Sequence, residues 1–444
     1  MQSNKHNSHE RLRRRPLGRY RYVRLRWRVM FSLIDTLGYM LFAIARFLKR
    51  PFFNVPTKKA DDPSRILLIQ LDHMGDAIIT TVMLPLLQRR YPRASIEVLC
   101  GAWNRELFLA MEEVDRVHIS RLNRFIRGDS CTLFNRFAWA GAVFLQGLRL
   151  RRRKYDLGID MRGEFPQALM LWLAGARRRL GWTSGGGGFL LTDTPPFVPD
   201  RPEVESRLAL LAELGITPTD SSQALPRFKP TAAAGQSVGN KLDELQIDNR
   251  QKRVALHVSA GTTAKRWPVE HWRTLLDMLL ASGVQVFLVG GPGDRVISKR
   301  ILGDRCLAGV VDFTGRLSVV ELAALLQRVD LLIGGDSGPA HLAAAVKTPV
   351  VALFSGTNNH RQWQPCGPDV AVVHHPVACS PCHREQCPLA AHPCMQKLEP
   401  AQVASAAARF IPIYTNNDNR ETAIHDSSTS PAAHEKAARR TTII

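Results

Sequence analysis

The feature of this sequence that most restricts its fold is an alternation of apolar runs and helical patterns, which occurs in two separate halves. In the first half, the run Arg65–Leu71 is followed by a helical pattern as far as Arg90, and further apolar runs occupy Ser95–Cys100 and Leu157–Asp160. Continuous apolar runs are typical of strands that are buried on both faces of a parallel sheet. Because strands that alternate with helices form such sheets through right-handed crossovers, this half predicts a parallel α/β sheet.

The same alternation begins again after residues 216–250, a stretch rich in Pro, Thr, Ala, Ser and Gln that we interpret as a linker with one short helix. The strands expected in the second half are Val254–Val258, Val284–Gly290, Leu331–Gly334 and Val350–Phe354. The helices expected there are Val269–Ser282, Ser318–Gln327 and Pro339–Ala345. The sequence therefore predicts an α/β fold of two doubly wound domains that face each other across a cleft. Ligands of such sheets lie at the carboxyl ends of the strands.

The boundaries follow from these changes of pattern. We place the first domain at residues 61–235 and the second at residues 250–415. Residues 1–60 form a basic and apolar extension, and the polar residues 416–444 are expected to be disordered. The glycine-rich stretch Thr183–Gly188 lacks the strand-then-helix context of a phosphate-binding loop, so we interpret it as a mobile loop.

The net charge of +21 over 444 residues is concentrated at the N-terminus. Residues 1–50 contain 13 Lys and Arg against Glu10 and Asp35, which is a net charge of +11. This distribution favours a basic segment that contacts an anionic surface over a protein that coats nucleic acid. The two folded halves also carry no basic stripe with interleaved aromatic residues, which nucleic-acid binding would favour.

An apolar stretch from Val29 to Leu48 follows the basic run, and Asp35 and Arg46 interrupt it. It therefore lacks the ~20 uncharged residues of a clean membrane span. As a helix it would carry its polar and small residues along one narrow stripe, and the rest of its surface would be apolar. The stripe is formed by Ser32, Thr36, Tyr39, Ala43, Arg46 and Arg50. We interpret it as a helix that lies in a membrane interface, and the alternative is a helix packed on the protein itself. A signal peptide is disfavoured because a basic region of ~28 residues precedes the apolar part.

The strand-to-helix turn Gly334–His341 has the pattern of an anion-binding site. Pro339 fits the first helical turn, where backbone amides lack partners, and these amides and the helix dipole attract anions. His341 lies in the same turn and can donate to a phosphate. The alternative is that Ser337 only caps the helix and that His341 is structural.

A second loop, Ser259–Pro268, supports the phosphate interpretation. It contains small hydroxyl residues, a glycine and the pair Lys265–Arg266 just before a helix, which suits phosphate oxygens. Two such loops in one domain indicate a diphosphate. A third loop, Gly290–Asp294, supplies a carboxylate that can hold a ribose diol, by analogy with dinucleotide sites.

Asp76 follows the first strand of the first half and is expected to face the cleft. A helix cap is one interpretation of this aspartate. The other is a general base. A base opposite a diphosphate is what glycosyl transfer requires, because one group takes the proton of the acceptor hydroxyl and another stabilises the leaving nucleotide.

Three segments, RILLIQLDHMGDAIITT, HVSAGTTAKRWPVEHW and LLIGGDSGPAHLAAA, together resemble the glycosyltransferase family 9 heptosyltransferases. The likeness covers roughly Ser64 to Ile411, the motifs occur in the family's order, and the later segment CSPCHREQCP is also similar. These enzymes transfer ADP-activated heptose to the inner core of bacterial lipopolysaccharide. The resemblance implies the GT-B architecture of two facing Rossmann-like domains, a donor bound by the C-terminal domain, and inversion at the anomeric centre.

The resemblance also implies roles for the residues that carry the reaction. Asp76 matches the family's catalytic base, and Lys265 matches the lysine that contacts the donor phosphates. Thr262 and Thr263 match the hydroxyl residues beside that lysine. Asp76 would thus accept the proton of an acceptor hydroxyl, whose oxygen attacks the anomeric carbon opposite the diphosphate, while Lys265 stabilises the leaving group.

Further matches concern the donor. Asp336 matches the aspartate that contacts the donor sugar, Asp294 falls near a glutamate that holds the ribose, and Leu317 falls where the family packs an apolar residue on adenine. The diphosphate turn is matched by Ser337, Gly338 and His341. The resemblance thus implies a nucleotide-sugar and a lipid-linked oligosaccharide acceptor as partners. The N-terminal ~60 residues are not part of the family's core, and from their basic and apolar pattern we expect residues 11–50 to contact the cytoplasmic face of the inner membrane, with no nucleic-acid partner.

No metal-dependent diphosphate site is indicated, because the chain contains no Asp-x-Asp motif, and no cofactor is expected. Four cysteines could nevertheless hold a structural zinc ion: Cys379, Cys382, Cys387 and Cys394. Their spacing is irregular for a zinc ribbon, so reduced thiols or one disulfide are the alternative interpretation.

Other functions remain open at this point. A family 9 enzyme could use another nucleotide-sugar in a surface polysaccharide pathway, and a nucleotide-sugar epimerase shares the architecture. A third hypothesis is a basic membrane-binding or nucleic-acid-binding protein that uses the cysteines as a zinc module. Product analysis would separate the epimerase from a transferase, and salt-sensitive binding to nucleic acid would favour the third hypothesis.

Overall fold

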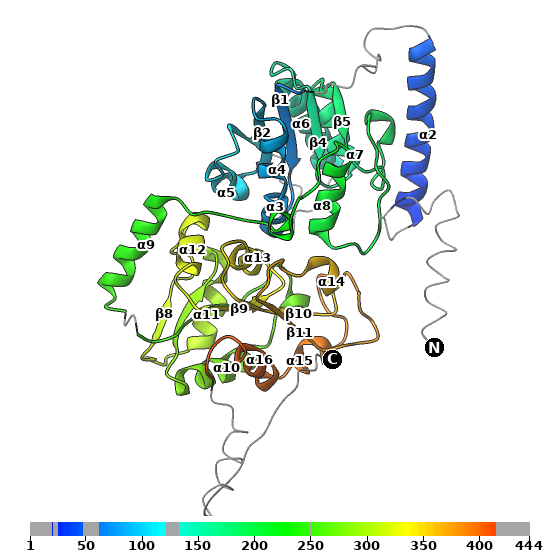
Figure 1. Cartoon of the computed structure of the whole chain (residues 1–444). Coiled ribbons are helices and arrows are strands. Elements are labelled where there is room, and N and C mark those ends of the chain that lie inside the picture. The colour runs from blue at the N-terminus through cyan, green and yellow to red at the C-terminus, as the bar shows by residue number, and fades with distance from the viewer. Residues whose placement is uncertain (1–19, 21–24, 48–61, 121–132, 248–249, 414–444) are drawn as a thin grey trace, which may run out of the picture.

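The computed structural model describes residues 20, 25–47, 62–120, 133–247 and 250–413. The expected tail at residues 416–444 lies outside these ranges, and so do residues 11–19 and 21–24 of the basic run Arg11–Arg28. Two parallel sheets, each flanked by helices, form an upper and a lower body in Figure 1. The predicted α/β fold class is confirmed.

The N-terminal sheet has the strand order β3-β2-β1-β4-β5, and all its neighbouring strands are parallel. Its strands are β1 Arg65–Gln70, β2 Ser95–Gly101, β3 Arg116–Ser120, β4 Leu157–Asp160 and β5 Arg178–Leu180. Its helices are α3 Met74–Thr80, α4 Met83–Arg90, α5 Arg105–Leu109, α6 Leu133–Arg151, α7 Phe165–Leu173 and α8 Glu203–Ala212. The strands predicted at β1, β2 and β4 are confirmed, whereas β3 and β5, which are short and carry several charged or polar residues, were not predicted.

The C-terminal sheet has the order β11-β10-β9-β6-β7-β8, again all parallel. Its strands are β6 Arg253–His257, β7 Gln285–Val289, β8 Val310–Asp312, β9 Leu331–Gly335, β10 Val350–Phe354 and β11 Val370–His374. The helices of this half are α10 Val269–Ala281, α11 Arg295–Leu302, α12 Val319–Leu326, α13 Gly338–Ala345, α14 His360–Trp363, α15 Pro393–Gln396 and α16 Pro400–Ala407. The short strands β8 and β11 are additions to the predicted set.

Each sheet has one point at which the strand order reverses. In the N-terminal sheet the chain builds outward from β1 to β3 and then returns to the other side of β1 with β4, so the reversal lies between β1 and β4. In the C-terminal sheet it lies between β6 and β9. Crevices for ligands form at the carboxyl ends of strands at such points. Asp76, Lys265 and Asp336 all lie in segments that follow strands at these two reversals.

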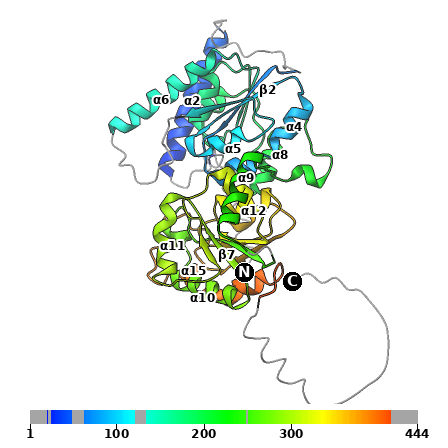
Figure 2. The same ribbon diagram turned by 90° about the vertical axis from the view of Figure 1, so that its left-hand side faces the viewer.

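The two halves are joined by residues that are ordered for much of their length. Helix α9 (Ala232–Glu244) occupies the predicted linker and packs against α12, where Ser237 and Lys241 both contact the Glu321 carboxylate. Figures 1 and 2 show α9 beside the C-terminal body. The predicted short helix thus has 13 residues and serves as a covering element of the second half.

Helix α2 (Leu25–Phe47) stands beside the N-terminal body and not within a sheet layer (Figure 1). It contacts the glycine-rich stretch that the sequence indicated as a mobile loop. Residues 184–188 are buried, and the Gly187 amide donates to Asp35 Oδ1 at 2.7 Å. A Cβ at Gly186 would lie 2.5 Å from the Phe31 ring. The glycines therefore allow close approach of a helix, and the interpretation as a loosely held loop is wrong.

Candidate functional site

The two halves meet where the first turns of α3 and α13 pack against each other. Two glycines make this contact possible. A Cβ at Gly75 would lie 3.0 Å from His341 Cδ2, and a Cβ at Gly338 would lie 2.2 Å from Met74 Cε. Helix α13 is otherwise built largely of alanine, and all its residues after Gly338 are buried. This packing brings Asp76, two residues from Met74, to the edge of the C-terminal sheet that carries Asp336.

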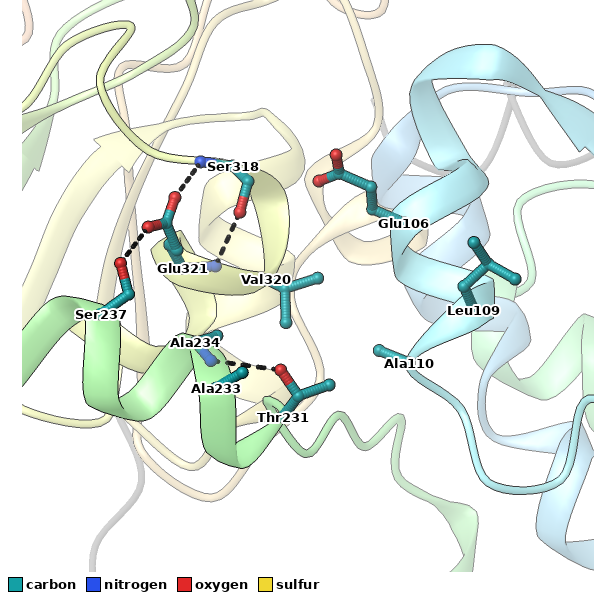
Figure 3. Close-up of a pocket in the computed structure, with 10 residues that line it drawn as sticks. All are labelled: Glu106, Leu109, Ala110, Thr231, Ala233, Ala234, Ser237, Ser318, Val320 and Glu321. Carbon is teal, nitrogen blue, oxygen red and sulfur yellow. Dashed lines mark hydrogen bonds between the residues drawn. The ribbon is translucent and has the colours of Figure 1, made fainter.

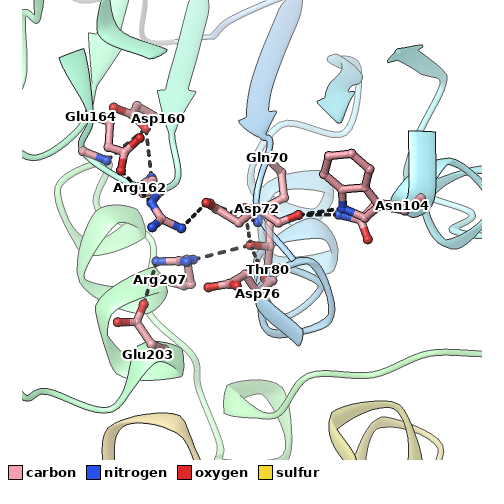
Figure 4. Close-up of polar contacts among 12 residues, drawn as sticks. Gln70, Asp72, Asp76, Thr80, Asn104, Asp160, Arg162, Glu164, Glu203 and Arg207 are labelled. Atoms are coloured by element: carbon pink, nitrogen blue, oxygen red, sulfur yellow. Dashed lines mark hydrogen bonds and ion pairs between the residues drawn. The ribbon is translucent and has the colours of Figure 1, made fainter. Parts of the chain in front are cut away.

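Asp76 lies in the first turn of α3 and is 8% exposed. Charged side chains from three other segments of the N-terminal domain surround it (Figure 4). Arg162, after β4, forms an ion pair with Asp72 and a second one with Glu164 at 2.9 Å. Arg207, from α8, pairs with Glu203 at 3.1 Å. Neither Arg162 nor Arg207 was predicted as a neighbour, because they lie 86 and 131 residues from Asp76 in the sequence.

Burial, followed by the negative charge of Asp72, raises the pKa of Asp76 to about 7. Arg162 and Arg207 oppose the shift but do not cancel it. A carboxylate with a pKa near neutrality can take a proton at physiological pH and release it again, which suits a general base. A carboxylate that only capped a helix would have no need of this environment.

On the C-terminal side, Lys265 and Asp336 come together from different loops. Lys265 ends the 3₁₀ turn Thr263–Lys265 after β6, and its Nζ lies 2.5 Å from Asp336 Oδ2. The Asn358 side chain donates to the same oxygen at 2.8 Å. The pair lies near His341, since both groups act on its pKa. The structure thus assembles, at the carboxyl ends of β6 and β9, the cation and carboxylate that the sequence placed 71 residues apart.

His341 is 6% exposed, and its burial lowers its pKa to about 4. The imidazole is therefore neutral at pH 7, with one nitrogen as donor and one as acceptor. It can still donate a hydrogen bond to a phosphate, as predicted, but it adds no positive charge. Positive potential at this turn comes from Lys265 and from the amides at the start of α13.

Comparison with known proteins gives the context of this geometry. Residues 146–392 match glycosyltransferase family 9 (heptosyltransferase), which is more than half of the chain. The chain belongs to glycosyltransferase family 9. It is also 27% identical over 297 residues to lipopolysaccharide heptosyltransferase 3 of Escherichia coli, covering 66% of this chain and 83% of the relative. Lipooligosaccharide heptosyltransferase 2 of Haemophilus influenzae is 26% identical over 321 residues, with 69% and 87% covered.

Solved structures of family 9 enzymes share the fold. Escherichia coli ADP-heptose lipopolysaccharide heptosyltransferase II superposes with a TM-score of 0.62 at 23% identity, covering 78% of this chain and 98% of that one. A family 9 glycosyltransferase from Veillonella parvula gives a TM-score of 0.65 at 19% identity, with 79% and 98% covered. The predicted GT-B architecture of two facing Rossmann-like domains is confirmed, and this family 9 protein is a glycosyltransferase.

His257 lies among the predicted donor-binding residues of this family 9 protein, and the sequence patterns did not single it out. It ends β6, and its Nδ1 lies 2.9 Å from Ser337 Oγ. Its Nε2 lies 3.8 Å from Asp294 Oδ2. The ring thus connects the predicted diphosphate turn with the predicted ribose carboxylate. Its place at the carboxyl end of a strand, beside the reversal of strand order, is the signal that could have found it.

Asp294 lies at the predicted edge of the sheet. Burial alone would raise its pKa, but the nearby His257 and Ser259 side chains and the hydrogen bond from the Gly291 amide outweigh burial and lower the pKa to about 2. The carboxylate is therefore ionised and can accept hydrogen bonds from a diol. Its role at a ribose stays a prediction.

The two threonines before Lys265 differ in their surroundings. Thr262 is buried, and its hydroxyl has no hydrogen-bond partner within the described part of the chain. Such a group is unusual in a protein interior, and phosphate oxygens would satisfy it. Thr263 is exposed, and its hydroxyl donates to the Glu385 carbonyl at 3.1 Å, toward the cysteine-containing segment. Leu317 is half-buried and packs against the core directly before α12.

The cysteine-containing segment braces the Lys265 loop. The Ala264 amide donates to the Glu385 carbonyl at 3.0 Å, and His392 Nε2 lies 3.0 Å from the Ala264 carbonyl. The four cysteines of the zinc hypothesis, Cys379, Cys382, Cys387 and Cys394, are free thiols. Across the described ranges, no group of three or more His, Cys, Asp or Glu side chains is arranged to hold a metal ion. The structure therefore gives the segment a bracing role and lends zinc no support.

A cavity of ≈ 370 Å³ lies elsewhere, between α5, α9 and α12 (Figure 3). Glu106 and Leu109 line it from the N-terminal side, and Thr231, Ser318 and Glu321 line it from the other. Its lining contains none of the predicted catalytic or donor-binding residues. Ser318 and Glu321 are already engaged there, because each caps the other at the start of α12.

Proposed function

We propose that this family 9 protein is an inverting heptosyltransferase that transfers heptose from an ADP-activated donor to a lipopolysaccharide core or a similar lipid-linked glycan. One observation carries the proposal: the buried carboxylate of Asp76 lies across the α3–α13 contact from the Lys265–Asp336 pair. Family membership supports the sugar, and relatives named lipopolysaccharide heptosyltransferase support the acceptor. A structure of Escherichia coli heptosyltransferase WaaC with ADP, a structural neighbour at a TM-score of 0.54, supports the nucleotide.

In this mechanism Asp76 removes the proton of the acceptor hydroxyl. The resulting oxygen nucleophile attacks the anomeric carbon on the face opposite the diphosphate, so the configuration inverts. Lys265 and the amides at the start of α13 stabilise the negative charge that develops on the leaving diphosphate. Ser337 and His341 contact the same phosphates, and Asp336 contacts the donor sugar.

The remaining donor contacts follow from the same arrangement. Thr262 supplies its buried hydroxyl to a phosphate, and Asp294 holds the ribose diol. His257 positions both Ser337 and Asp294 because it contacts the two side chains from opposite ring nitrogens. Leu317 packs on the adenine. Thr263, whose hydroxyl is directed to Glu385, orients the loop that carries Lys265.

Nucleotide preference tests this proposal. The melting temperature of the purified protein should rise in the presence of ADP more than in equal concentrations of UDP or GDP, because a ligand stabilises the folded state that it binds, by an amount that increases with its affinity. A larger shift with UDP or GDP would indicate that the donor is a sugar activated by that nucleotide and not ADP-heptose. Incubation with ADP-heptose and a heptose-deficient lipopolysaccharide should then yield a product one heptose larger by mass spectrometry.

The pH dependence of the reaction tests the role of Asp76. Its carboxylate must be ionised to accept a proton, and its pKa is raised to about 7. We therefore expect kcat/KM to fall about tenfold for each pH unit below about 7 and to level off above it. Activity that stayed constant between about pH 5 and pH 8 would contradict the raised pKa of Asp76, because an unperturbed aspartate is ionised throughout that range.

We further propose that the enzyme works at the cytoplasmic face of the inner membrane, where a lipid-linked acceptor is found, and that residues 11–50 contact that membrane. The net charge of +11 over residues 1–50 supports this location, because the cytoplasmic leaflet carries anionic lipid.

A further inference from the structure

The two faces of helix α2 differ from those of a helix on a water-soluble protein, which buries apolar residues and exposes polar ones. Four residues at helical spacing form the face that is buried against the protein: Asp35, Gly38, Phe42 and Ala45. The only acidic residue of the helix thus points inward. The outward side, which water would contact in a soluble protein, consists mainly of large apolar residues.

Asp35 is held firmly on the inward face. It is 1% exposed, its Oδ1 accepts the Gly187 amide at 2.7 Å, and its Oδ2 accepts the Tyr20 hydroxyl at 2.8 Å. Phe42, about two turns further along the helix, packs on Phe189 and Trp172, with ring-centroid distances of 5.3 and 6.1 Å. The helix is therefore an integral element of the N-terminal domain along most of its length.

The outward face forms a continuous apolar surface. Its exposed apolar residues are Leu25, Val29, Leu33, Leu37, Met40, Leu41, Ile44 and Phe47. Because an α-helix turns once every 3.6 residues, most of these lie roughly opposite Asp35. Their side chains are 41–88% exposed, over a helix of 23 residues, or about 34 Å. An apolar row of this length on a water-facing side marks an interaction surface.

We propose that helix α2 lies flat on an anionic lipid bilayer, with its docked face on the N-terminal domain and its outward apolar face in the membrane interface. The positive charge of the N-terminal segment favours an anionic membrane as the partner of this face. Residues 1–24 contain eight Lys and Arg against one Glu, and Arg26 and Arg28 follow in the first turns of the helix. A basic segment beside an apolar helix face is the combination that binds anionic membranes. The inference extends the proposed function, although membrane binding itself requires no sugar transfer.

The docking contacts decide between lying on the membrane and crossing it. By length and composition, Leu25–Ala45 could cross a bilayer, with a mean hydropathy of 1.5 and 22% of it buried within the protein. A crossing helix would have to separate Asp35 from Gly187 and Tyr20 and carry a carboxylate into hydrocarbon, which is costly. A flat helix keeps these contacts and buries only the outward face.

Binding to vesicles tests the surface. The parent protein should co-sediment with phosphatidylcholine vesicles that contain about 30% phosphatidylglycerol and should be released by high salt, since charge contributes to binding. The double variant Leu33→Asn with Leu37→Asn should bind at least about tenfold more weakly, because it removes apolar area from the interface without touching the docked face. The matched control is Leu245→Asn with Leu389→Asn, two leucines of similar exposure outside α2, which should bind like the parent.

Extraction of vesicle-bound protein with alkaline carbonate separates the two membrane arrangements. A helix that lies flat is released, whereas a helix that crosses the bilayer is retained, and retention would overturn the proposal. Equal vesicle binding by the Leu33→Asn, Leu37→Asn variant and its control would also overturn it, since the outward face would then contribute nothing. A protein that binds vesicles as expected but transfers no heptose would contradict the proposed function alone.

Hydrogen exchange tests whether the inward face of α2 is docked on the N-terminal domain. Asp35→Ala removes the acceptor of the Gly187 amide, so backbone hydrogen exchange at Gly185–Phe189 should accelerate, while Asp35→Asn, which retains one acceptor oxygen, should have a smaller effect. Unchanged exchange in Asp35→Ala would mean that α2 is not docked in solution, which would contradict the flat arrangement.

Discussion

Replacement of Asp76 by asparagine is expected to lower kcat for heptose transfer by about 10³-fold, because the amide cannot accept the proton of the attacking hydroxyl. The affinity for ADP should change by less than about threefold, since the carboxylate belongs to the acceptor side of the contact. Steady-state kinetics and calorimetric titration with ADP measure the two effects. Asp304→Asn, at an exposed aspartate of the C-terminal domain, is the control for the same chemical change.

The stability of Asp76→Asn shows whether a loss of activity results from unfolding of the variant. Since the pKa of Asp76 rises from 3.8 in the unfolded chain to about 7 in the folded protein, the folded state holds this proton more tightly. The ionised aspartate therefore destabilises the fold increasingly from about pH 4 to about pH 7, by up to about 4 kcal/mol. Asp76→Asn should thus unfold at higher urea concentration than the parent at pH 8, and the difference should vanish near pH 4.

A variant that retained full kcat would end the assignment of Asp76 as the base. A variant that lost both activity and stability at pH 8 would instead mean that the carboxylate is required for the fold. Gain of stability together with loss of activity is the combination that a buried catalytic group predicts, because such sites hold groups in environments that the fold alone would not select.

Lys265→Ala is expected to have the second largest effect, a loss of about 10²-fold or more in kcat, together with a weaker affinity for ADP. The lysine is the cation at the predicted diphosphate site, and its removal leaves the developing charge to backbone amides and neutral side chains. It also leaves Asp336 with Asn358 as its remaining side-chain partner among the contacts described above. Kinetics with ADP-heptose and a thermal shift with ADP measure both consequences.

Lys299→Ala is the matched control, because Lys299 is an exposed lysine of the same domain on α11. Lys265→Arg should recover part of the activity, since it restores the charge but not the geometry. If Lys265→Ala weakened ADP binding without lowering kcat, the lysine would bind the ground state and the transition state equally, and the leaving-group role would pass to the start of α13.

Local patterns in the sequence were sufficient for much of the fold. The runs at β1, β6 and β9 are apolar because their strands are buried on both faces, and a turn rich in small residues follows β6 and β9. The short strands β3 and β8 escaped prediction because they are partly exposed, so their residues follow no continuous apolar run. The sequence also showed that His257 lies at the end of a strand, but it did not show that Ser337 and Asp294 are its partners.

Sequence alone determined the α/β class, the family, and the segments that hold Asp76, Lys265 and Asp336, because these depend on residues that are close along the chain. Only the tertiary structure decided what surrounds them. The pKa of Asp76 depends on burial and on Asp72, Arg162 and Arg207, and the glycines at 75 and 338 let the two halves approach. The inward direction of Asp35 likewise depends on a loop 152 residues away. Burial and long-range contact are properties of the folded chain, so no local pattern contains them.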